Sequence, residues 1–287
     1  MSRIGLVYDR IRFEEKVILK KGEERGLSMK LSDAKDLCLY VQGSDEEFKA
    51  TFGDVVLQRC ISYFRGLNIT AFLESKGIYV INPLSVAQIC GNKVLSTLAL
   101  ERAGVPTPET IVSFSPESVF KAIEKLGYPV VLKPIIGSWG RLVALLKDKE
   151  TTESIIEARE LLNSPLHKIY YTQEMINRPP RDIRTIVVGD RVIASIYRYA
   201  PQDDWRTNVA RGGKTAPCPL TKELEGLVLK AAKAVGGGIL GVDAMESPKG
   251  ILVHEVNNTV EFRGAMAAGA TNIPNEILNY VVGLSRR

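Results

Sequence analysis

Three side chains near the end of the sequence have the types and spacing of a divalent-cation site. Asp243 lies in one apolar run, Glu255 and Asn257 lie in the next, and a short turn with proline and glycine joins the two runs. Carboxylate and amide oxygens are the ligands that Mg²⁺ prefers, and nucleotide phosphates and water can complete its coordination. The pattern therefore predicts a magnesium site that holds a phosphate-bearing ligand.

The two apolar runs, 239–245 and 251–257, predict an antiparallel hairpin. Symmetry about the turn places Asp243 opposite Val253. Because side chains alternate between the faces of a strand, Val253 and Glu255 share the face of Asp243, as does Asn257. Glu255 is then a diagonal neighbour of Asp243 at about 7–8 Å, close enough for one cation between them. The alternative is a solvated face of an amphipathic hairpin, but unpaired carboxylates inside an apolar strand are costly.

A lysine followed by a glycine-bearing loop is the second candidate feature. An apolar strand ends at Lys133, and the segment Gly137, Ser138, Trp139, Gly140 and Arg141 leads into the next strand. Such a loop can lay backbone N–H groups over phosphates while the lysine supplies a positive charge. It is not a Walker A motif, because GxxxxGK[ST] is missing and a strand follows. A tight turn stabilised by its tryptophan would explain the same residues on structural grounds.

A second lysine, Lys93, stands at a predicted helix start behind glycine and asparagine. A positive charge there opposes the helix dipole, and a bound anion would remove the conflict. A simple surface lysine explains the position equally well.

A predicted strand also ends at Gln173, Glu174, Met175 and Ile176 and passes into a proline-rich turn. Backbone groups in such a hinge commonly contact an adenine edge, with a nearby carboxylate such as Asp182 for the ribose. An ion pair at the sheet edge is the alternative for Asp182, and spacing does not separate the two.

Arginines gather in the loop after the strand 191–197. Arg198, Arg206 and Arg211 fall within fourteen residues, with Asn208 and a Gly-Gly pair among them. Guanidinium groups suit carboxylate and phosphate recognition because they form paired hydrogen bonds. Arg263 could add to the cluster. A solvated basic loop is the bland alternative, but the neighbouring asparagine and glycines favour a binding role.

The elements that must position these residues belong to an α/β chain of three parts. Strand and helix alternate over the first eighty residues, which predicts a parallel sheet, but no GxGxxG follows the first strand. An extended linker at 105–108 precedes a segment of two helices and several strands, and antiparallel strands with two helices complete the chain. We expect domains at 1–88, 89–169 and 170–287.

Composition excludes several classes of protein. The 287 residues are 45% hydrophobic and 25% charged, without a run long enough to span a membrane, so we expect a cytoplasmic protein with no membrane contact. The 4 cysteines are scattered, which disfavours disulfide scaffolds and structural zinc. A net charge of +5, spread along the chain, fits a phosphate ligand or an acidic partner better than nucleic acid.

Taken together, these motifs resemble those of ATP-grasp ligases, and the resemblance covers nearly the whole chain. The pieces, in order, are Gly91-Asn92-Lys93, Val131-Leu132-Lys133-Pro134, Gly137–Arg141, Gln173-Glu174, Arg181-Asp182-Ile183-Arg184, Arg206-Thr207-Asn208, Arg211-Gly212-Gly213, Asp243 and Glu255-Val256-Asn257.

Within the superfamily the sequence is most similar to the RimK-like branch, and there to the LysX group. That narrower match rests on Tyr8–Arg12, Pro134–Arg141, Ala210–Gly213 and Glu255–Phe262. The resemblance implies an ATP-grasp fold: a Rossmann-like βαβ domain, a small central lid domain and a C-terminal sheet domain, with ATP between the last two.

The resemblance also implies roles for single residues. Lys93 and Lys133 would contact ATP phosphates under the 137–141 loop, the hinge 173–176 would hold adenine, and Asp182 with Asn208 would complete the nucleotide site. Asp243, Glu255 and Asn257 match magnesium positions, and Lys133, Arg206 and Arg211 would stabilise the reacting phosphate. The expected amino-acid surface comprises Arg198, Asn208, Val209, Ala210, Arg211, Gly212, Glu261, Phe262, Arg263, Gly264 and Ala265.

The implied reaction joins an amino acid to the C-terminal glutamate of LysW, an acidic amino-group carrier protein, through an acyl phosphate, in lysine or arginine biosynthesis. Members that use 2-aminoadipate resemble Asn-Ser or Asn-Thr after the arginine at 263, and glutamate-using members resemble Gly-Phe. Here the pair is Gly264-Ala265, which leaves 2-aminoadipate, glutamate or both as substrates. One methylene separates the two acids, worth about 1–3 kcal/mol in a pocket. A related ligase could instead add glutamate to another acceptor. We also expect a homo-oligomer, either a dimer or a tetramer.

Overall fold

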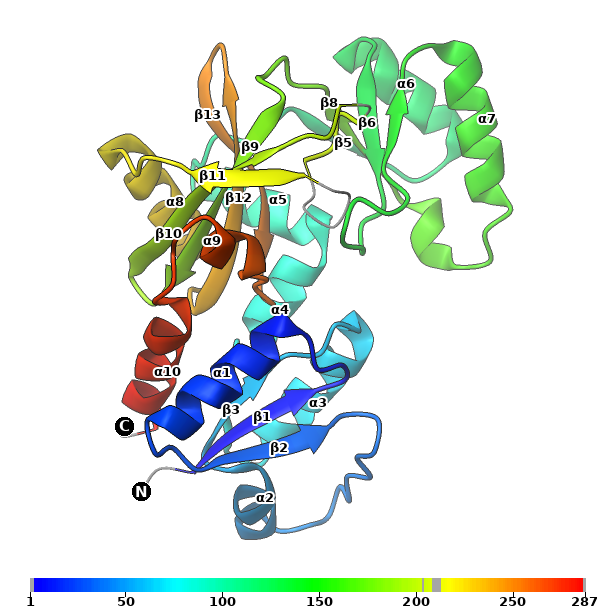
Figure 1. Cartoon of the computed structure of the whole chain (residues 1–287). Helices are drawn as coiled ribbons and strands as arrows, with labels where there is room; N and C mark the ends of the chain where they lie inside the picture. The colour runs from blue at the N-terminus through cyan, green and yellow to red at the C-terminus, as the bar shows by residue number, and fades with distance from the viewer. Residues whose placement is uncertain (1–2, 203, 208–212, 286–287) are drawn as a thin grey trace.

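The computed structural model describes residues 3–202, 204–207 and 213–285, and in this part the chain forms three sheets (Figure 1). The predicted site residues Asn208, Val209, Ala210, Arg211 and Gly212 lie outside the described residues. No helix of the described part is both long and apolar enough to cross a membrane.

The first sheet is parallel, as the alternation of strands and helices predicts. Its strand order is β2-β1-β3-β4. Helix α1 covers one face, while α2 and α3 cover the other, so the apolar strands are buried on both sides. The bounds are β1 (Ile4–Tyr8), α1 (Phe13–Glu24), β2 (Met29–Asp33), α2 (Asp45–Phe52), β3 (Val55–Gln58), α3 (Tyr63–Ser75) and β4 (Tyr79–Ile81).

Two helices lead from this sheet into the rest of the molecule (Figure 1). They are α4 (Leu84–Gly91) and α5 (Lys93–Arg102). Asn92 begins α5 by accepting hydrogen bonds from the backbone of Val94 and Leu95. The cap fixes the position of Lys93, the first residue of α5, beside the central loop.

The central sheet is antiparallel, in the order β5-β8-β6-β7, with helices packed on one face. Val130 and Leu132 point toward these helices. Alternation along the strand therefore turns Val131 and Lys133 to the opposite, open face. The bounds are β5 (Thr110–Ser113), α6 (Pro116–Leu126), β6 (Val130–Lys133), β7 (Ala144–Leu146), α7 (Lys149–Glu160), the 3₁₀ turn η1 (Pro165–Lys168) and β8 (Tyr170–Glu174).

Strand β8 differs from its predicted place. We assigned residues 170–287 to the third domain, yet β8 pairs with β5 and β6 in the central sheet. The break between the two sheets therefore falls after Glu174, at the proline-rich turn. Sequence order alone does not reveal this, because β7, α7 and η1 separate β8 from its partners β5 and β6 along the chain.

The third sheet is antiparallel, in the order β11-β10-β9-β12-β13. Helix α8 packs on one face, and α9 and α10 pack on the other, where α10 also lies beside α1 of the first sheet (Figure 1). The bounds are β9 (Arg181–Val188), β10 (Arg191–Tyr199), β11 (Lys214–Pro217), α8 (Lys222–Ala234), β12 (Ile239–Ser247), β13 (Gly250–Asn257), α9 (Arg263–Ala267) and α10 (Ile273–Leu284).

The β12–β13 hairpin forms, but its predicted register is wrong. Asp243 pairs directly with Glu255, Ala244 pairs with Val253, and His254 is the extra residue of a β-bulge between them. Val253 is fully buried against α8, on the face away from Asp243. The bulge breaks the symmetry about the turn, and it brings Glu255 opposite Asp243 instead of diagonal to it.

Buried Asn82 links the end of the first sheet to the third sheet, and its hydrogen bonds should contribute measurably to stability. Its amide donates to the carbonyls of Ile239 (2.7 Å) and Asn258 (2.8 Å), and its oxygen accepts from Ile239 N–H (2.7 Å). Asn82→Ala strands these buried backbone groups, so we expect the free energy of unfolding to fall by about 3 kcal/mol in urea denaturation. The control Asn68→Ala, whose exposed amide makes one local bond to Phe64, should cost about 0.5 kcal/mol or less. Equal losses would contradict the assigned role of Asn82.

Candidate active site

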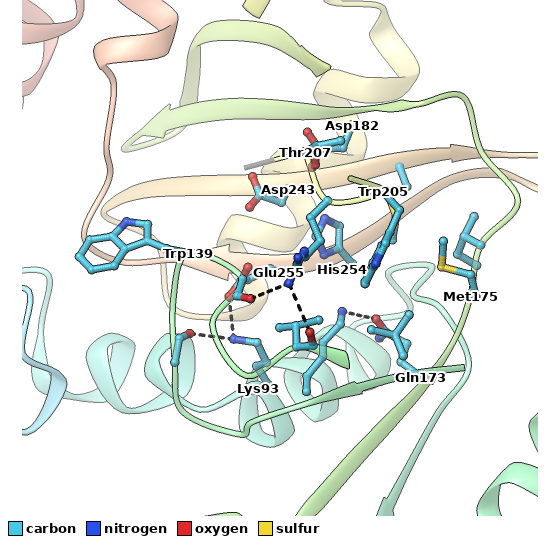
Figure 2. A pocket seen from close by; sticks show the side chains of 18 of the residues that line it. Lys93, Trp139, Gln173, Met175, Asp182, Trp205, Thr207, Asp243, His254 and Glu255 are labelled. Atoms are coloured by element: carbon cyan, nitrogen blue, oxygen red, sulfur yellow. Dashed lines mark hydrogen bonds and ion pairs between the residues drawn. The ribbon is translucent and has the colours of Figure 1, made fainter. Parts of the chain in front are cut away.

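A pocket of about 850 Å³ lies between the central and third sheets (Figure 2). The predicted nucleotide residues that are described all line it, although they come from distant parts of the sequence. They are Lys93, Lys133, Gly137, Ser138, Trp139, Gly140, Arg141, Gln173, Glu174, Met175, Ile176 and Asp182. Arg206, one of the predicted catalytic residues, also lines the pocket.

Lys133 is held by a network of neutral side chains. Its Nζ donates to Gln173 Oε1 at 2.5 Å, and the Gln173 amide donates to Thr110 and to the hydroxyl of Tyr171. Burial lowers the pKa of Lys133 to about 8, because an ammonium group loses its hydration there. The side chain still carries its charge at neutral pH, and a bound anion would stabilise that charge, so the site favours a phosphate beside Lys133.

Lys93 bridges the loop and the third sheet. Its Nζ donates to the Gly137 carbonyl (3.0 Å) and pairs with Glu255 (2.9 Å). Burial opposes the ionisation of Glu255, but Lys93 and other positive neighbours outweigh it and hold the pKa of Glu255 at about 2. The conflict between Lys93 and its helix dipole is thus relieved here by a carboxylate of the protein.

The predicted magnesium residues lie together. Asp243 and Glu255 are cross-strand partners, and Asn257 Nδ2 is 3.4 Å from Asp243 Oδ2. Two arginines meet Asp243, with Arg184 Nε at 2.5 Å and Arg198 at 3.1 Å from its Oδ1. Burial raises the pKa of the Asp243 carboxyl, and the two guanidinium groups counteract this effect.

The donor set fits a hard divalent cation. Two carboxylates and an amide side chain lie together, and Asp243 Oδ1 is buried and engaged only in ion pairs with Arg184 and Arg198. Among the described residues, no cluster holds three or more metal-binding His, Cys, Asp or Glu side chains. Such a cation would therefore take the rest of its ligands from a nucleotide and water.

The glycine-bearing loop closes one side of the pocket. Gly140 adopts φ 65°, a left-handed conformation that favours glycine. Trp139 Nε1 donates to both carboxylate oxygens of Glu261 at 3.2 Å, and Arg206 approaches the carbonyls of Gly140 and Val143 at 3.5 Å. The loop is thus tied to the third domain at its middle and at its C-terminal end.

Apolar side chains form the inner end of the pocket. Val131, Met175, Ile176, Trp205 and Met245 line it. Beside them, Glu174, Met175 and Ile176 of the hinge at the end of β8 also line the cavity. A flat aromatic base fits such a slot. Apolar side chains can stack on its two faces, and the hinge backbone can form hydrogen bonds with its edge.

Asp182 has a structural partner. Its carboxylate receives paired hydrogen bonds from Arg198 at 2.8 and 2.7 Å, and a further one from the Thr207 hydroxyl. Both oxygens are therefore engaged inside the protein, and Arg198 is oriented toward Asp243. The ion-pair alternative from the sequence describes this contact, although Asp182 still lines the pocket wall.

A second, larger open cleft of about 2880 Å³ meets the first at the carboxylate cluster. It runs between the first and third sheets, and Lys93, Arg198, Asp243 and Glu255 line both cavities. The predicted amino-acid residues that line this second cleft are Arg198, Glu261, Arg263, Gly264 and Ala265. Phe262 was expected there too, but it is fully buried in the core and anchors the segment instead.

Several pocket residues were not predicted from the sequence. Arg184 was seen only as part of a motif, yet it pairs with Asp243. His254 lines the nucleotide pocket with a buried Nε2 that has no hydrogen-bond partner, and it is the extra residue of the bulge. Others are Val131, Pro134, Val143, Arg178, Trp205, Thr207 and Met245. These residues reach the pocket because strands distant in sequence pair with one another. The sequence alone does not show this pairing.

Comparisons with known proteins give the class that this fold and site define. Residues 90–281 match the model of the RimK-like ATP-grasp domain, and residues 4–89 match that of the LysX preATP-grasp domain. A RimK-domain ATP-grasp protein from Sphaerobacter thermophilus superposes with a TM-score of 0.82, covering 98% of this chain and 100% of its own, at 27% identity. A D-alanine–D-alanine ligase from Bacillus anthracis, solved with ATP, shares the fold with a TM-score of 0.74 at 20% identity, covering 100% and 98%.

Two kinds of curated relative are similar over nearly their whole length. The glutamate–LysW ligase ArgX of Sulfolobus acidocaldarius is 37% identical over 97% of this chain and 98% of its own. The alpha-aminoadipate–LysW ligase LysX of Saccharolobus solfataricus is 37% identical over 93% of this chain and 96% of its own. The chain belongs to the RimK-like ATP-grasp family and is an ATP-grasp ligase.

The buried Asp182–Arg198 pair predicts a pH dependence of stability. Burial would raise the pKa of Asp182, but Arg198 and Thr207 bring it from 3.8 to about 2. A carboxyl with a lowered folded pKa contributes stability that is complete above its unfolded pKa and is lost as the pH falls through the folded value. Between about pH 5 and pH 2, the free energy of unfolding should fall about 2 kcal/mol more in the wild type than in Asp182→Asn.

Urea titrations at several pH values measure this difference. The control is Asp36→Asn, which changes an exposed aspartate in the first domain and should follow the wild type. Parallel curves for the wild type and Asp182→Asn would show that the pair does not hold Asp182 ionised.

Proposed function

We propose that the protein forms an amide between the C-terminal glutamate carboxylate of the carrier protein LysW and the α-amino group of 2-aminoadipate or glutamate, using ATP. The observation that carries the proposal is the cluster of Asp243, Glu255 and Asn257 at the junction of the two clefts. The terminal phosphate of ATP in the first cleft and the acceptor carboxylate in the second cleft would meet at this cluster.

ATP would occupy the first pocket. The apolar slot and the hinge 173–176 would hold adenine, while Lys93, Lys133 and the loop 137–141 would surround the phosphates. Asp243, Glu255 and Asn257 would hold Mg²⁺, which would supply neutralisation of the negative charge of the phosphates. Asp243 and Glu255 line both clefts, and Asn257 lines the second.

The chemistry consists of two transfers. A carboxylate oxygen of the acceptor attacks the γ-phosphorus, the bond to ADP breaks, and an acyl phosphate forms. The uncharged amine of the amino acid then attacks the acyl carbon, the carbon–oxygen bond to phosphate breaks, and the nitrogen loses a proton as the amide forms. No protein nucleophile is required, so the task of the side chains is alignment and charge neutralisation.

Cationic side chains would perform that task. Lys133 and Arg206 line the nucleotide pocket, and Arg198 reaches the carboxylate cluster from the second cleft. Arg211, which we also assign to the reacting phosphate, lies outside the described residues. Attack by one anion on another is slow without such neutralisation, because the reactants repel each other.

The acceptor is proposed from the relatives and from charge. The relatives are named as ligases that act on LysW, with glutamate or alpha-aminoadipate as the second substrate. A net charge of +5 favours association with an acidic partner protein. We place the activity in lysine biosynthesis, with arginine biosynthesis included where glutamate is used.

The expected activity can be measured as ADP release. With LysW, ATP and Mg²⁺, we expect turnover with 2-aminoadipate and with glutamate, and none when LysW or its last glutamate is omitted. In a competition between the two acids, Gly264-Ala265 should give a preference of at most about 200-fold, because one methylene is worth about 1–3 kcal/mol in a pocket.

Mass spectrometry of LysW provides the product assignment. A single added aminoadipyl or glutamyl unit supports the proposal. Absence of product with either acid, from protein that still binds ATP, would overturn the proposed acceptor and favour a glutamate ligase that acts on another substrate.

The carboxylate cluster gives a prediction for a variant. Glu255→Gln removes a charged oxygen ligand but keeps the size of the side chain, so we expect kcat to fall at least about 100-fold. Asp243→Asn should have a similar effect on turnover. Thermal denaturation and circular dichroism should show the fold of Glu255→Gln to be intact.

The matched control is Glu246→Gln on the same hairpin. Glu246 pairs with Arg181 outside both clefts, so its loss should leave kcat within about twofold. Near wild-type turnover in both Glu255→Gln and Asp243→Asn would remove these residues from the proposed magnesium site.

A further inference from the structure

The first turn of α1 holds the segment that lines the second cleft. Glu14 is 4% exposed, and its Oε1 accepts hydrogen bonds from the backbone N–H groups of Phe262 (3.1 Å) and Arg263 (3.0 Å). These residues stand almost at opposite ends of the sequence. A contact of this kind fixes backbone position directly, because the side chain binds main-chain atoms of the segment.

Neighbouring residues of the same turn support the contact. Arg12 pairs with Glu261 at 3.0 Å, and the ring of Phe13 packs edge-on against Phe262 with centroids 6.5 Å apart. The Arg263 guanidinium lies 5.8 Å from the centre of the Phe13 ring. Helix α1 therefore meets residues 261–263 through charge, backbone hydrogen bonds and aromatic packing together.

Glu14 also supplies what the start of α9 lacks. Phe262 precedes α9, and it offers no side-chain cap to the free N–H groups of the first turn. The carboxylate of Glu14 accepts from two N–H groups at this end, a pairing strengthened by its negative charge. On the other side, Thr215 of β11 donates to the Gly264 carbonyl at 3.1 Å. The pair Gly264-Ala265 is thus held between the first and third domains.

We propose that Glu14 is a positioning residue that fixes Gly264 and Ala265 against the second cleft and thereby sets the affinity and selectivity for the amino acid. This inference rests on the proposed function, because it assigns the wall at 263–265 to amino-acid binding. A pocket that discriminates by one methylene is sensitive to small displacements of its wall. Glu14 itself does not need to touch the amino acid.

The test compares variants that differ in the ability to accept a hydrogen bond. Glu14→Ala removes the acceptor, whereas Glu14→Gln keeps an oxygen at the same distance along the side chain. We expect Glu14→Ala to raise the KM for the amino acid at least about tenfold and to change the ratio of aminoadipate to glutamate use, with the KM for ATP within about twofold. Glu14→Gln should restore the KM for the amino acid to within about threefold of the wild type.

Two further variants serve as controls for nonspecific effects of substitution and for loss of folding. Glu23→Ala changes an exposed glutamate of the same helix and should leave all constants unchanged. Glu14→Met fills the buried site without accepting, and it replaces Glu14→Ala if the smaller side chain prevents folding. Equal effects on the KM for ATP and for the amino acid, or equal behaviour of Glu14→Gln and Glu14→Ala, would overturn the inference.

Hydrogen exchange separates this inference from the proposed function. The amides of Phe262 and Arg263 should exchange at least about tenfold faster in Glu14→Ala or Glu14→Met than in Glu14→Gln. An inactive wild type with this exchange pattern would refute the proposed substrates and retain the positioning of the segment. Unchanged exchange in the variants that lack an acceptor would refute the positioning itself.

Discussion

Negative charge buried at the junction of two clefts is the constraint on which the rest of the structure depends. Asp243 and Glu255 lie opposite each other on adjacent strands, where two carboxylates repel and lose hydration. Three cations from three different elements compensate them: Lys93 from α5, Arg184 from β9 and Arg198 from β10. Each of these elements must be in place before the charges are balanced. The cluster therefore couples the packing of the third sheet to the helix that leads out of the first.

Strand geometry determines which side chains of β6 and β13 point toward the nucleotide pocket. Alternation on β6 buries Leu132 under the helices and turns Lys133 toward the nucleotide pocket. The β-bulge at His254 shifts the register of β13, so that Glu255 meets Asp243 directly while Val253 stays in the core. A regular hairpin with the same residues would place these carboxylates farther apart. An irregularity of one residue thus decides whether the oxygen ligands can share a cation.

Local patterns revealed much of the fold and part of the site. Strand and helix periodicity predicted the parallel first sheet, and the residue types of Lys93, Lys133 and the 137–141 loop predicted a nucleotide pocket that the structure brings together. Most of the features that the sequence did not settle involve partners that are not neighbours in sequence. The sheet of β8, the burial of Phe262 and the engagement of Asp182 by Arg198 depend on tertiary pairing, which periodicity does not encode. The bulge is a local feature, but the prediction assumed a regular hairpin that is symmetric about the turn, and this assumption allows no extra residue.

The arrangement explains why a ligase of this kind needs three sheets and not two. The nucleotide pocket requires only the central and third sheets, because every predicted phosphate contact but Lys93 comes from them. In the proposed reaction the amino acid occupies the second cleft, which exists only because the first domain forms its other wall. Through Arg12 and Glu14 the same domain also holds the segment that lines the cleft. Under the proposed function, the first domain is therefore part of the amino-acid site, and changes on the first turn of α1 should bear on selectivity as changes in the cleft do.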